Sequence, residues 1–230
     1  MKIGMIVAVR EEIDALLRTC GTPCGTESVP GYSIFCYSVG THTVYVAESG
    51  AGELSAAATA QLLITRYDIA LLVNFGVCGG LTSELGLTQT VVVEKAVHYD
   101  FDASPFYHIA PCQYPGQQDI YLHAAPELVA RACEIVPSLR PVICASGDKF
   151  IESPVEKARL HDAYGAEICE MEAAGILLTA QRCGVPALLL KAVSDSVSGD
   201  AGEYAAMVHA SAEVCLRVLL EILRSMEETA

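Results

Sequence analysis

Short apolar runs alternate with segments of helical period along almost the whole chain, and this alternation constrains the fold more than any other feature. Strands are expected over residues 3–9, 69–74, 90–97, 141–145, 166–169 and 187–193, with a hairpin formed by 32–39 and 43–48. Helices are expected over residues 10–17, 53–66, 126–135, 171–182 and 203–225, and another is expected to open at Ser153-Pro154. Strands that alternate with helices predict a mainly parallel sheet covered on both faces.

The expected fold class is therefore α/β, with three layers (α/β/α) around a central mixed, mainly parallel sheet. Neither an internal repeat nor a linker divides the chain, so residues 1–230 are predicted to form a single domain. Hydrophobic residues make up 52% of the sequence and charged residues 18%, which argues against a disordered or fibrous protein. Residues 100–118 lack periodicity and are predicted to form a long loop that acts as a lid or a partner surface.

The charge and cysteine content narrow the partners and the compartment. A net charge of −14 without any basic run disfavours nucleic acid and anionic membranes as partners. The 10 cysteines are scattered through apolar stretches and are expected to be reduced, and Cys20 and Cys24 lack the second pair that a metal site needs. No signal segment opens the sequence and no uncharged apolar stretch of ~20 residues occurs, so a cytoplasmic protein without a metal or cofactor is expected.

Several carboxylates and glycines fall where predicted strands end. Ligands of open α/β sheets sit beyond the carboxyl ends of the strands. The residues expected to gather there are Glu12, Ser49 to Gly52, Gly76 to Gly80, Phe150-Ile151, Glu170 to Glu172 and Ser194-Asp195. Their convergence on one edge of one sheet makes them the candidate site.

Asp195 follows the apolar run 188–193, which places its carboxyl at the rim of a buried strand. Burial favours the neutral, protonated carboxyl, which can act as a general acid, and Ser194 can orient it with a hydrogen bond. The competing interpretation is a turn or helix cap, because Ser-Asp-Ser at a strand end is ordinary turn chemistry.

Glu170, Glu172 and Glu12 all stand at strand-to-helix junctions. Acidic side chains there also complement the positive end of a helix dipole, so a capping role is the alternative for each. The glycine segments 50–52 and 76–80 contain no Lys or Arg, which makes a neutral ligand a better match than a phosphate. Phe150 offers a face on which a base can stack, although a Phe in such a position is often part of the core.

The motifs together resemble the nucleoside phosphorylase and hydrolase superfamily and, within it, the 5′-methylthioadenosine/S-adenosylhomocysteine nucleosidases. The resemblance runs nearly end to end. It rests on Met1-Lys2-Ile3-Gly4 with Glu11-Glu12, Asn74-x-Gly76-x-x-Gly79-Gly80-Leu81, Ser146-Gly147-Asp148-x-Phe150-Ile151, Glu170-Met171-Glu172-Ala173 and Ala192-x-Ser194-Asp195. Each motif is weak, and their order and spacing together are specific.

By that resemblance, the chain is an N-glycosyl hydrolase that releases adenine from a nucleoside, a reaction of methionine salvage. Asp195 would protonate adenine N7 with Ser194 holding it, and Glu12 would deprotonate the attacking water. Glu172 would bind the ribose hydroxyls with Met171 against the sugar, while Phe150 would stack on adenine and the backbone of Ile151 would read its edge. The matching segments add Glu170, Val77, Gly79 and Lys191 to the expected substrate-binding residues.

The resemblance also implies a pocket for the 5′ substituent and a second subunit. Ala51 and Tyr204 occupy the stretches that match this apolar pocket, and Pro105 and Phe106 match the part that reaches a neighbouring subunit. A homodimer is therefore expected.

Two positions depart from the family pattern at the water site. The family nucleosidases usually have Ser where this chain has Val77 and Arg where it has Lys191; Val donates no side-chain hydrogen bond, and Lys lacks the planar fork of Arg. Arg10 either compensates for the changed donors at positions 77 and 191 or is a solvated residue at the start of a helix. Three alternatives stay open: a futalosine-type hydrolase, a phosphorylase of the same fold, and a nucleoside-binding protein without turnover.

Overall fold

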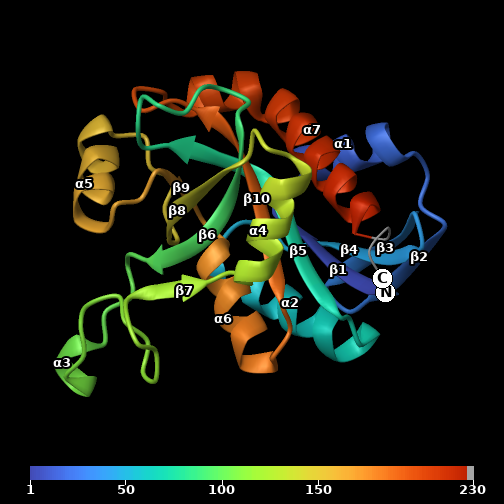
Figure 1. Cartoon of the computed structure of the whole chain (residues 1–230), viewed down its shortest axis with the longest axis horizontal. Helices are drawn as coiled ribbons and strands as arrows, with labels where there is room; N and C mark the ends of the chain where they lie inside the picture. Colours follow the sequence, from blue (N-terminus) through green and yellow to red (C-terminus); the bar gives the residue numbers. More distant parts are fainter. Residues whose placement is uncertain (227–230) are drawn as a thin grey trace.

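A central sheet of ten strands organises the molecule, which a computed structural model describes over residues 1–226 (Figure 1). The strands are β1 (Lys2–Val7), β2 (Gly25–Val29), β3 (Tyr32–Val39), β4 (His42–Glu48), β5 (Leu71–Gly80), β6 (Thr90–His98), β7 (Tyr121–His123), β8 (Arg140–Ser146), β9 (Ile168–Glu170) and β10 (Ala187–Asp195). β-Branched and other apolar side chains fill most of the central strands, and β10 is buried at each of its 9 positions. The sheet interior therefore forms the core of the fold.

Helices cover both faces of this sheet, as the sequence predicted. The helices are α1 (Arg10–Cys20), α2 (Glu53–Tyr67), α3 (Ser104–Tyr107), α4 (Pro126–Ile135), α5 (Pro154–Tyr164), α6 (Ala173–Cys183) and α7 (Ala201–Ser225). Helices α1, α4 and α7 pack on one face, whereas α2 and α6 pack together on the other (Figure 1). The three-layer α/β/α architecture is confirmed.

The sheet is mixed, and its strand pairings close part of it into a ring. Parallel pairings join β4 to β1, β1 to β5, β5 to β10, β6 to β8, and β8 to β9. Antiparallel pairings join β10 to β6 and β9 to β5, so the path β5–β10–β6–β8–β9 returns to β5. This closure brings the ends of β9 and β10 against the end of β5.

The prediction of a loop over Gly76 to Gly80 was wrong, because these residues continue β5. The register pairs Gly79 with both Asp195 of β10 and Cys169 of β9. A Cβ at Gly79 would lie 2.9 Å from Oδ2 of Asp195 and 3.0 Å from Sγ of Cys169, which is too close for any side chain. The glycine thus allows three strands of the ring to meet.

Other boundaries differ for local reasons. Ser194 and Asp195 belong to β10 and not to the following loop, because the pairing with β5 extends to Asp195. Helix α6 begins at Ala173, later than predicted, because β9 extends through Glu170. The sequence reading missed β2, an exposed polar strand at the edge of the sheet, and β7, which has only 3 residues. The predicted hairpin is confirmed as β3 and β4.

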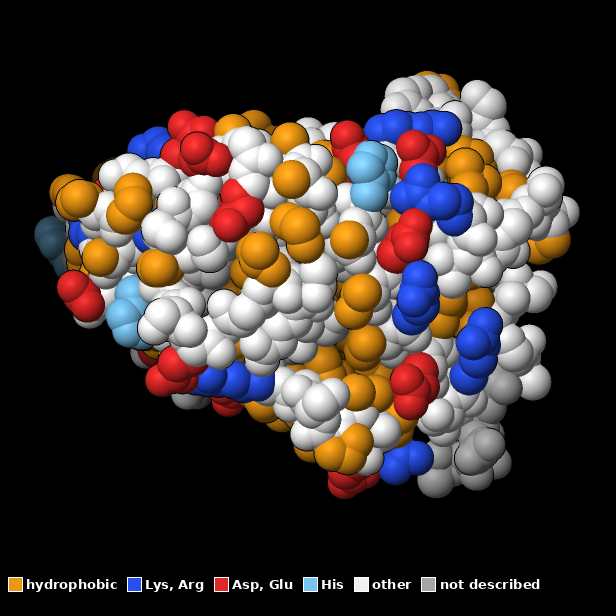
Figure 2. Space-filling view, turned by 90° about the horizontal axis from the view of Figure 1, so that it is seen from above, with side chains coloured by type: hydrophobic (Ala, Val, Ile, Leu, Met, Phe, Trp, Pro, Cys, Tyr) orange, Lys and Arg blue, Asp and Glu red, His pale blue; other side chains and the backbone are white. Residues whose placement is uncertain are grey.

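The surface agrees with the absence of a basic run in the sequence. On the face seen in Figure 2, Lys and Arg side chains are interspersed with Asp and Glu side chains. None of the helices within residues 1–226 is long and apolar enough to cross a membrane. The segment that includes α3 exposes two aromatic side chains, Phe106 at 79% and Tyr107 at 52%.

Candidate active site

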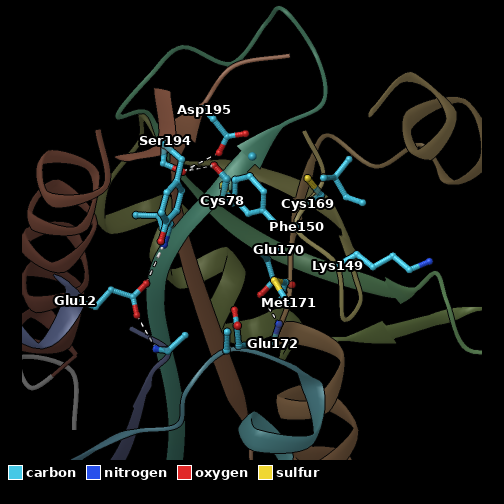
Figure 3. Close-up of a pocket in the computed structure, with 16 residues that line it drawn as sticks. Glu12, Cys78, Lys149, Phe150, Cys169, Glu170, Met171, Glu172, Ser194 and Asp195 are labelled. Carbon is cyan, nitrogen blue, oxygen red and sulfur yellow. Dashed lines mark hydrogen bonds between the residues drawn. The ribbon is translucent and has the colours of Figure 1, made fainter. Parts of the chain in front are cut away.

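A cavity of about 200 Å³ opens where β1, β5, β9 and β10 end (Figure 3). The residues that line it are Ala8, Glu12, Ala51, Val77, Cys78, Gly79, Lys149, Phe150, Ile151, Cys169, Glu170, Met171, Glu172, Ser194, Asp195 and Tyr204. All the proposed catalytic and substrate-binding residues except Lys191 are among them. Of the two expected glycine segments, Ala51, Val77, Cys78 and Gly79 line the cavity, whereas Ser49, Gly50, Gly52, Gly76 and Gly80 do not.

Asp195 ends β10 and is only 2% exposed. Its Oδ1 lies 3.0 Å from the hydroxyl oxygen of Ser194, which also lies 3.2 Å from the carbonyl oxygen of Cys78. Nζ of Lys157 lies 2.7 Å from Oδ2 of Asp195. The carboxyl is therefore held by side chains and does not cap a helix or turn within the described chain, contrary to the alternative interpretation.

Glu12 occupies the first turn of α1, directly after β1, and is 2% exposed. Its Oε2 accepts hydrogen bonds from the backbone N–H groups of Ala8 and Val9 at 2.6 and 3.2 Å, and its Oε1 accepts one from Val77 at 3.2 Å. The hydrogen bond from the backbone N–H of Val9, the N-cap residue, belongs to the cap of α1. The capping interpretation is therefore correct for one of the three hydrogen bonds of Glu12. A carboxylate has about four lone-pair directions, so one acceptor site remains for a ligand.

The environment of Glu12 favours the protonated form of its carboxyl more than water does. Burial raises the pKa of Glu12, against the opposing effects of Lys191 and of the three backbone N–H groups. Gly76 of β5 provides the space, because a Cβ there would lie 2.5 Å from Oε1 of Glu12.

The sequence left two roles open for Glu170 and Glu172, a helix cap and a residue of the site, and the two side chains differ in their contacts. Glu170 accepts hydrogen bonds from the backbone N–H groups of Glu172 and Ala173, so it is the residue that caps α6. Glu172 accepts a hydrogen bond from the backbone N–H of Gly52 at 3.1 Å and lines the cavity. Burial, opposed by Lys191, raises the pKa of Glu172 to about 7.

Lys191 lies behind the cavity wall and is 1% exposed. Its Nζ lies 2.8 Å from Oε2 of Glu170 and 3.7 Å from Oε2 of Glu172. Burial disfavours the ammonium, but Glu170, Glu172 and Glu12 outweigh it and raise the pKa of Lys191. Burial would also raise the pKa of Glu170, yet Lys191 reverses the direction and lowers it. Lys191 thus compensates the charge of the carboxylates beside the cavity.

Glu53, at the start of α2, is a buried acid that sequence reasoning missed. The Ser146 hydroxyl contacts Oε1 of Glu53 and lies 2.6 Å from Oε1 of Glu170, while the backbone N–H of Ala174 donates to it. A hydroxyl has one proton to donate, so one of the two carboxyls must be protonated. Burial and the charge of Glu170 raise the pKa of Glu53 to about 8, which makes Glu53 the protonated partner.

We expect Glu53→Gln to flatten the pH dependence of stability. The folded protein keeps this proton up to about pH 8, whereas an unfolded Glu releases it near pH 4.5. The wild-type protein therefore loses stability as pH rises through this window, by about 5 kcal/mol from this residue. Urea unfolding at pH 5, 7 and 9 measures the difference, with Glu94→Gln at an exposed position as the matched control. Equal slopes for the wild type and Glu53→Gln would refute the assignment.

Aromatic and apolar side chains form the rest of the cavity wall. Phe150 is 46% exposed and meets the ring of Tyr204 edge-on, with the centroids 5.4 Å apart, so Phe150 is not a core residue. Figure 3 shows Asp195 and Ser194 at one end of the view and Glu172 at the other, while the amino group of Lys149 points away from them.

Arg10 is 62% exposed and pairs with Asp14, which matches the solvated alternative.

Lys157 is the second functional candidate that the sequence analysis missed. It is fully buried on α5, beside the buried Leu160 one turn later, and contacts Asp195. A Lys on the apolar side of a helix was the available signal, but the partner lies 38 residues away in the sequence.

Among residues 1–226, no group of His, Cys, Asp and Glu side chains is arranged to hold a metal ion.

Comparison with known proteins identifies the family of the chain. The chain matches the Phosphorylase superfamily over residues 2–226. It is 31% identical over 205 residues to the 5′-methylthioadenosine/S-adenosylhomocysteine nucleosidase of Shewanella halifaxensis, which covers 87% of this chain and 88% of that relative. It is 29% identical over 208 residues to the aminodeoxyfutalosine nucleosidase of Campylobacter jejuni, which covers 89% of each chain.

Solved structures show the same relationship. The nucleosidase of Helicobacter pylori, solved with butyl-thio-DADMe-Immucillin-A, has a TM-score of 0.91 at 25% identity and covers 98% of both chains. The futalosine hydrolase of the same organism matches with the same score, identity and coverage. The resemblance drawn from the motifs is confirmed: the chain belongs to the phosphorylase superfamily and, within it, to the 5′-methylthioadenosine/S-adenosylhomocysteine nucleosidase family.

Proposed function

We propose that this enzyme hydrolyses the N-glycosidic bond of 5′-methylthioadenosine, S-adenosylhomocysteine or both, and releases adenine and a 5-substituted ribose. The observation that carries the proposal is the pair of buried carboxyl groups, Glu12 at the start of α1 and Asp195 at the end of β10, that line one small cavity. Cleavage of this bond needs an acid at the base and a base at the water, and the two groups supply them.

Asp195 is the general acid in this mechanism. It protonates N7 of adenine, so that the base leaves as a neutral molecule while the ribose gains oxocarbenium character. Ser194 supports the assignment, because its hydroxyl lies 3.0 Å from Oδ1 of Asp195 and holds the carboxyl in one orientation. General acid catalysis of this kind contributes roughly 10²- to 10⁴-fold to a rate.

Glu172 binds the ribose hydroxyls and Phe150 binds the base. Glu172 lines the cavity, and its Oε1 accepts a hydrogen bond from the backbone N–H of Gly52. Its Oε2 lies 3.7 Å from Nζ of Lys191 and is available to accept a hydrogen bond from the ribose. Met171 packs against the sugar, and the half-exposed ring of Phe150 provides a face for adenine, whose edge the backbone of Ile151 reads. Ala51 and Tyr204 receive the 5′ substituent.

Glu12 deprotonates the attacking water through its remaining acceptor site. Val77 contributes its backbone N–H to Glu12 at 3.2 Å, which supports a role for this position although its side chain donates nothing. Phosphate suits the cavity less well than water, because three carboxyl groups lie together there, those of Glu12, Glu170 and Glu172, and they would repel an anion. The ammonium of Lys191 lies among them, but it is already paired with Glu170. Hydrolysis is therefore favoured over phosphorolysis.

A futalosine-type substrate is the second candidate. The aminodeoxyfutalosine nucleosidase of Campylobacter jejuni is 29% identical to the chain, nearly as similar as the first relative. Both relatives are named as nucleosidases, so the same acid and base would serve either substrate. Experiment must decide between the two substrates.

We further propose a cytoplasmic homodimer that acts in methionine salvage. The exposure of Phe106 at 79% and of its neighbour Tyr107 at 52% supports an interface at α3. Light scattering after gel filtration measures the molar mass, and a value that corresponds to one 24.4 kDa chain would refute the dimer.

Adenine release from a panel of nucleosides tests the function. Methylthioadenosine, S-adenosylhomocysteine, aminodeoxyfutalosine and inosine are assayed with and without phosphate. We expect adenine from the first two without phosphate and no hypoxanthine from inosine. Release only with phosphate would identify a phosphorylase, preference for aminodeoxyfutalosine would select the second candidate, and binding without release would leave a nucleoside-binding protein.

A further inference from the structure

Lys157 is fully buried in α5, although an ammonium loses several kcal/mol of hydration energy when it leaves water. Its Nζ lies 2.7 Å from Oδ2 of Asp195. The pair joins the end of β10 to a helix that starts three residues after Ile151 of the cavity wall. A buried pair of this kind is stable only when its remaining hydrogen bonds are satisfied.

The hydrogen bonds of Lys157 are satisfied. An ammonium has three donors, and Nζ has three acceptors: Oδ2 of Asp195, the carbonyl oxygen of Ser196 at 2.6 Å and the carbonyl oxygen of Gly199 at 3.2 Å. Lys157 does not line the cavity. It has no donor left for a ligand, so any effect on the reaction passes through Asp195 and the segment that follows it.

The contacts of Lys157 fix Asp195 from the side opposite Ser194. Lys157 holds Oδ2, and Ser194, which contacts the carbonyl oxygen of Cys78 on β5, holds Oδ1. One carboxyl oxygen is therefore held by Lys157 of α5, and the other is held by Ser194, which also contacts β5. Holding a reacting group in one geometry removes the entropy cost of orienting it in the transition state.

The same ammonium fixes the connection from β10 to α7. The carbonyl oxygens of Ser196 and Gly199 belong to this connection, and Gly199 precedes the first turns of α7, where Tyr204 packs against Phe150. Lys157 thus links the orientation of the acid to the position of the aromatic wall of the cavity.

We propose that Lys157 is a positioning residue for the general acid: it orients the carboxyl of Asp195 toward the bound base and holds residues 196–199 in place. This inference rests on the proposed function, in which Asp195 protonates adenine. Other titratable groups around the pair are the Cys78 and Cys169 thiols on β5 and β9 and the Tyr204 phenol on α7. Burial raises the pKa of each of them, so they are neutral at pH 7 and leave Lys157 as the cation that acts on Asp195.

The test is the steady-state kinetics of adenine release by Lys157→Met. We expect kcat to fall about 10- to 100-fold with KM within about threefold, because orientation of the acid affects the transition state more than substrate binding. Lys157→Gln, which keeps two N–H donors without the charge, should recover part of the lost kcat.

Two controls separate positioning from a purely structural role. Arg159→Met removes an exposed positive charge from the same helix and should leave kcat and KM unchanged. In an Asp195→Asn background, Lys157→Met should cost no further activity, because Lys157 acts through Asp195. A rise of KM as large as the fall of kcat, or a full additional loss in the Asp195→Asn background, would overturn the proposal.

Failure of the proposed function is distinguishable from failure of this inference. Absence of adenine release by the wild-type enzyme would refute the function itself. If Lys157→Met does not fold, Lys157→Gln gives the changes in kcat and KM. The double variant Lys157→Met/Asp195→Asn, which buries no unpaired charge, gives the comparison with Asp195→Asn.

Discussion

Asp195→Asn is expected to abolish adenine release, with kcat/KM reduced at least about 1000-fold. The amide has no acidic proton to give to N7, although it fills the same space and still accepts one hydrogen bond. The variant leaves the ammonium of Lys157 buried without its counter-charge, so we also expect a lower midpoint of thermal unfolding. Activity is therefore measured well below that midpoint, with circular dichroism as the check on folding.

Asp200→Asn is the matched control for this variant. It makes the same substitution in the same connection, and Asn replaces Asp well as the N-cap of α7, where Asp200 accepts from Gly202 and Glu203. The control should keep wild-type activity. Near-normal turnover by folded Asp195→Asn would exclude Asp195 as the general acid.

Glu12→Gln is expected to bind a nucleoside but hydrolyse it at least about 100-fold more slowly. The amide can still accept a backbone hydrogen bond but cannot remove a proton from water. Because burial raises the pKa of Glu12, this residue should also produce the acidic limb of the wild-type pH–rate profile, and that limb should disappear in the variant. Calorimetric titration with a nucleoside analogue that resists hydrolysis measures binding, and stopped assays of adenine release measure turnover.

Glu11→Gln is the control, since it removes one negative charge from the neighbouring position of the same helical turn. It should retain both binding and turnover. Equal losses of affinity and turnover in Glu12→Gln would mean that Glu12 only holds the connection from β1 to α1, through its bonds to Ala8 and Val9.

Much of the fold follows from periodicity, and the exceptions have identifiable causes. Apolar runs placed the central strands correctly because those strands are buried on both faces. The glycines of β5 were taken as a loop because glycine is common in loops, whereas here they permit close approach of β9 and β10. β2 escaped notice because its exposed polar residues carry no alternation.

The residues of the site were predictable where the fold requires them at strand ends. Glu12, Glu172 and Asp195 line one cavity for that reason, with their catalytic roles left to the experiments above. The protonation states were not predictable. Which carboxyl keeps a proton depends on Ser146 between Glu53 and Glu170, and no sequence spacing encodes that contact.

The sequence by itself determined the α/β class, the candidate carboxylates and the family, because each follows from local patterns or from motifs in order. Tertiary structure alone decided the ring of strands, the position of Lys191 behind the cavity wall and the pairing of Lys157 with Asp195. These features join residues far apart in the chain, and the energies of buried charges depend on their neighbours in space. The charges around the candidate carboxyls are thus a property of the fold.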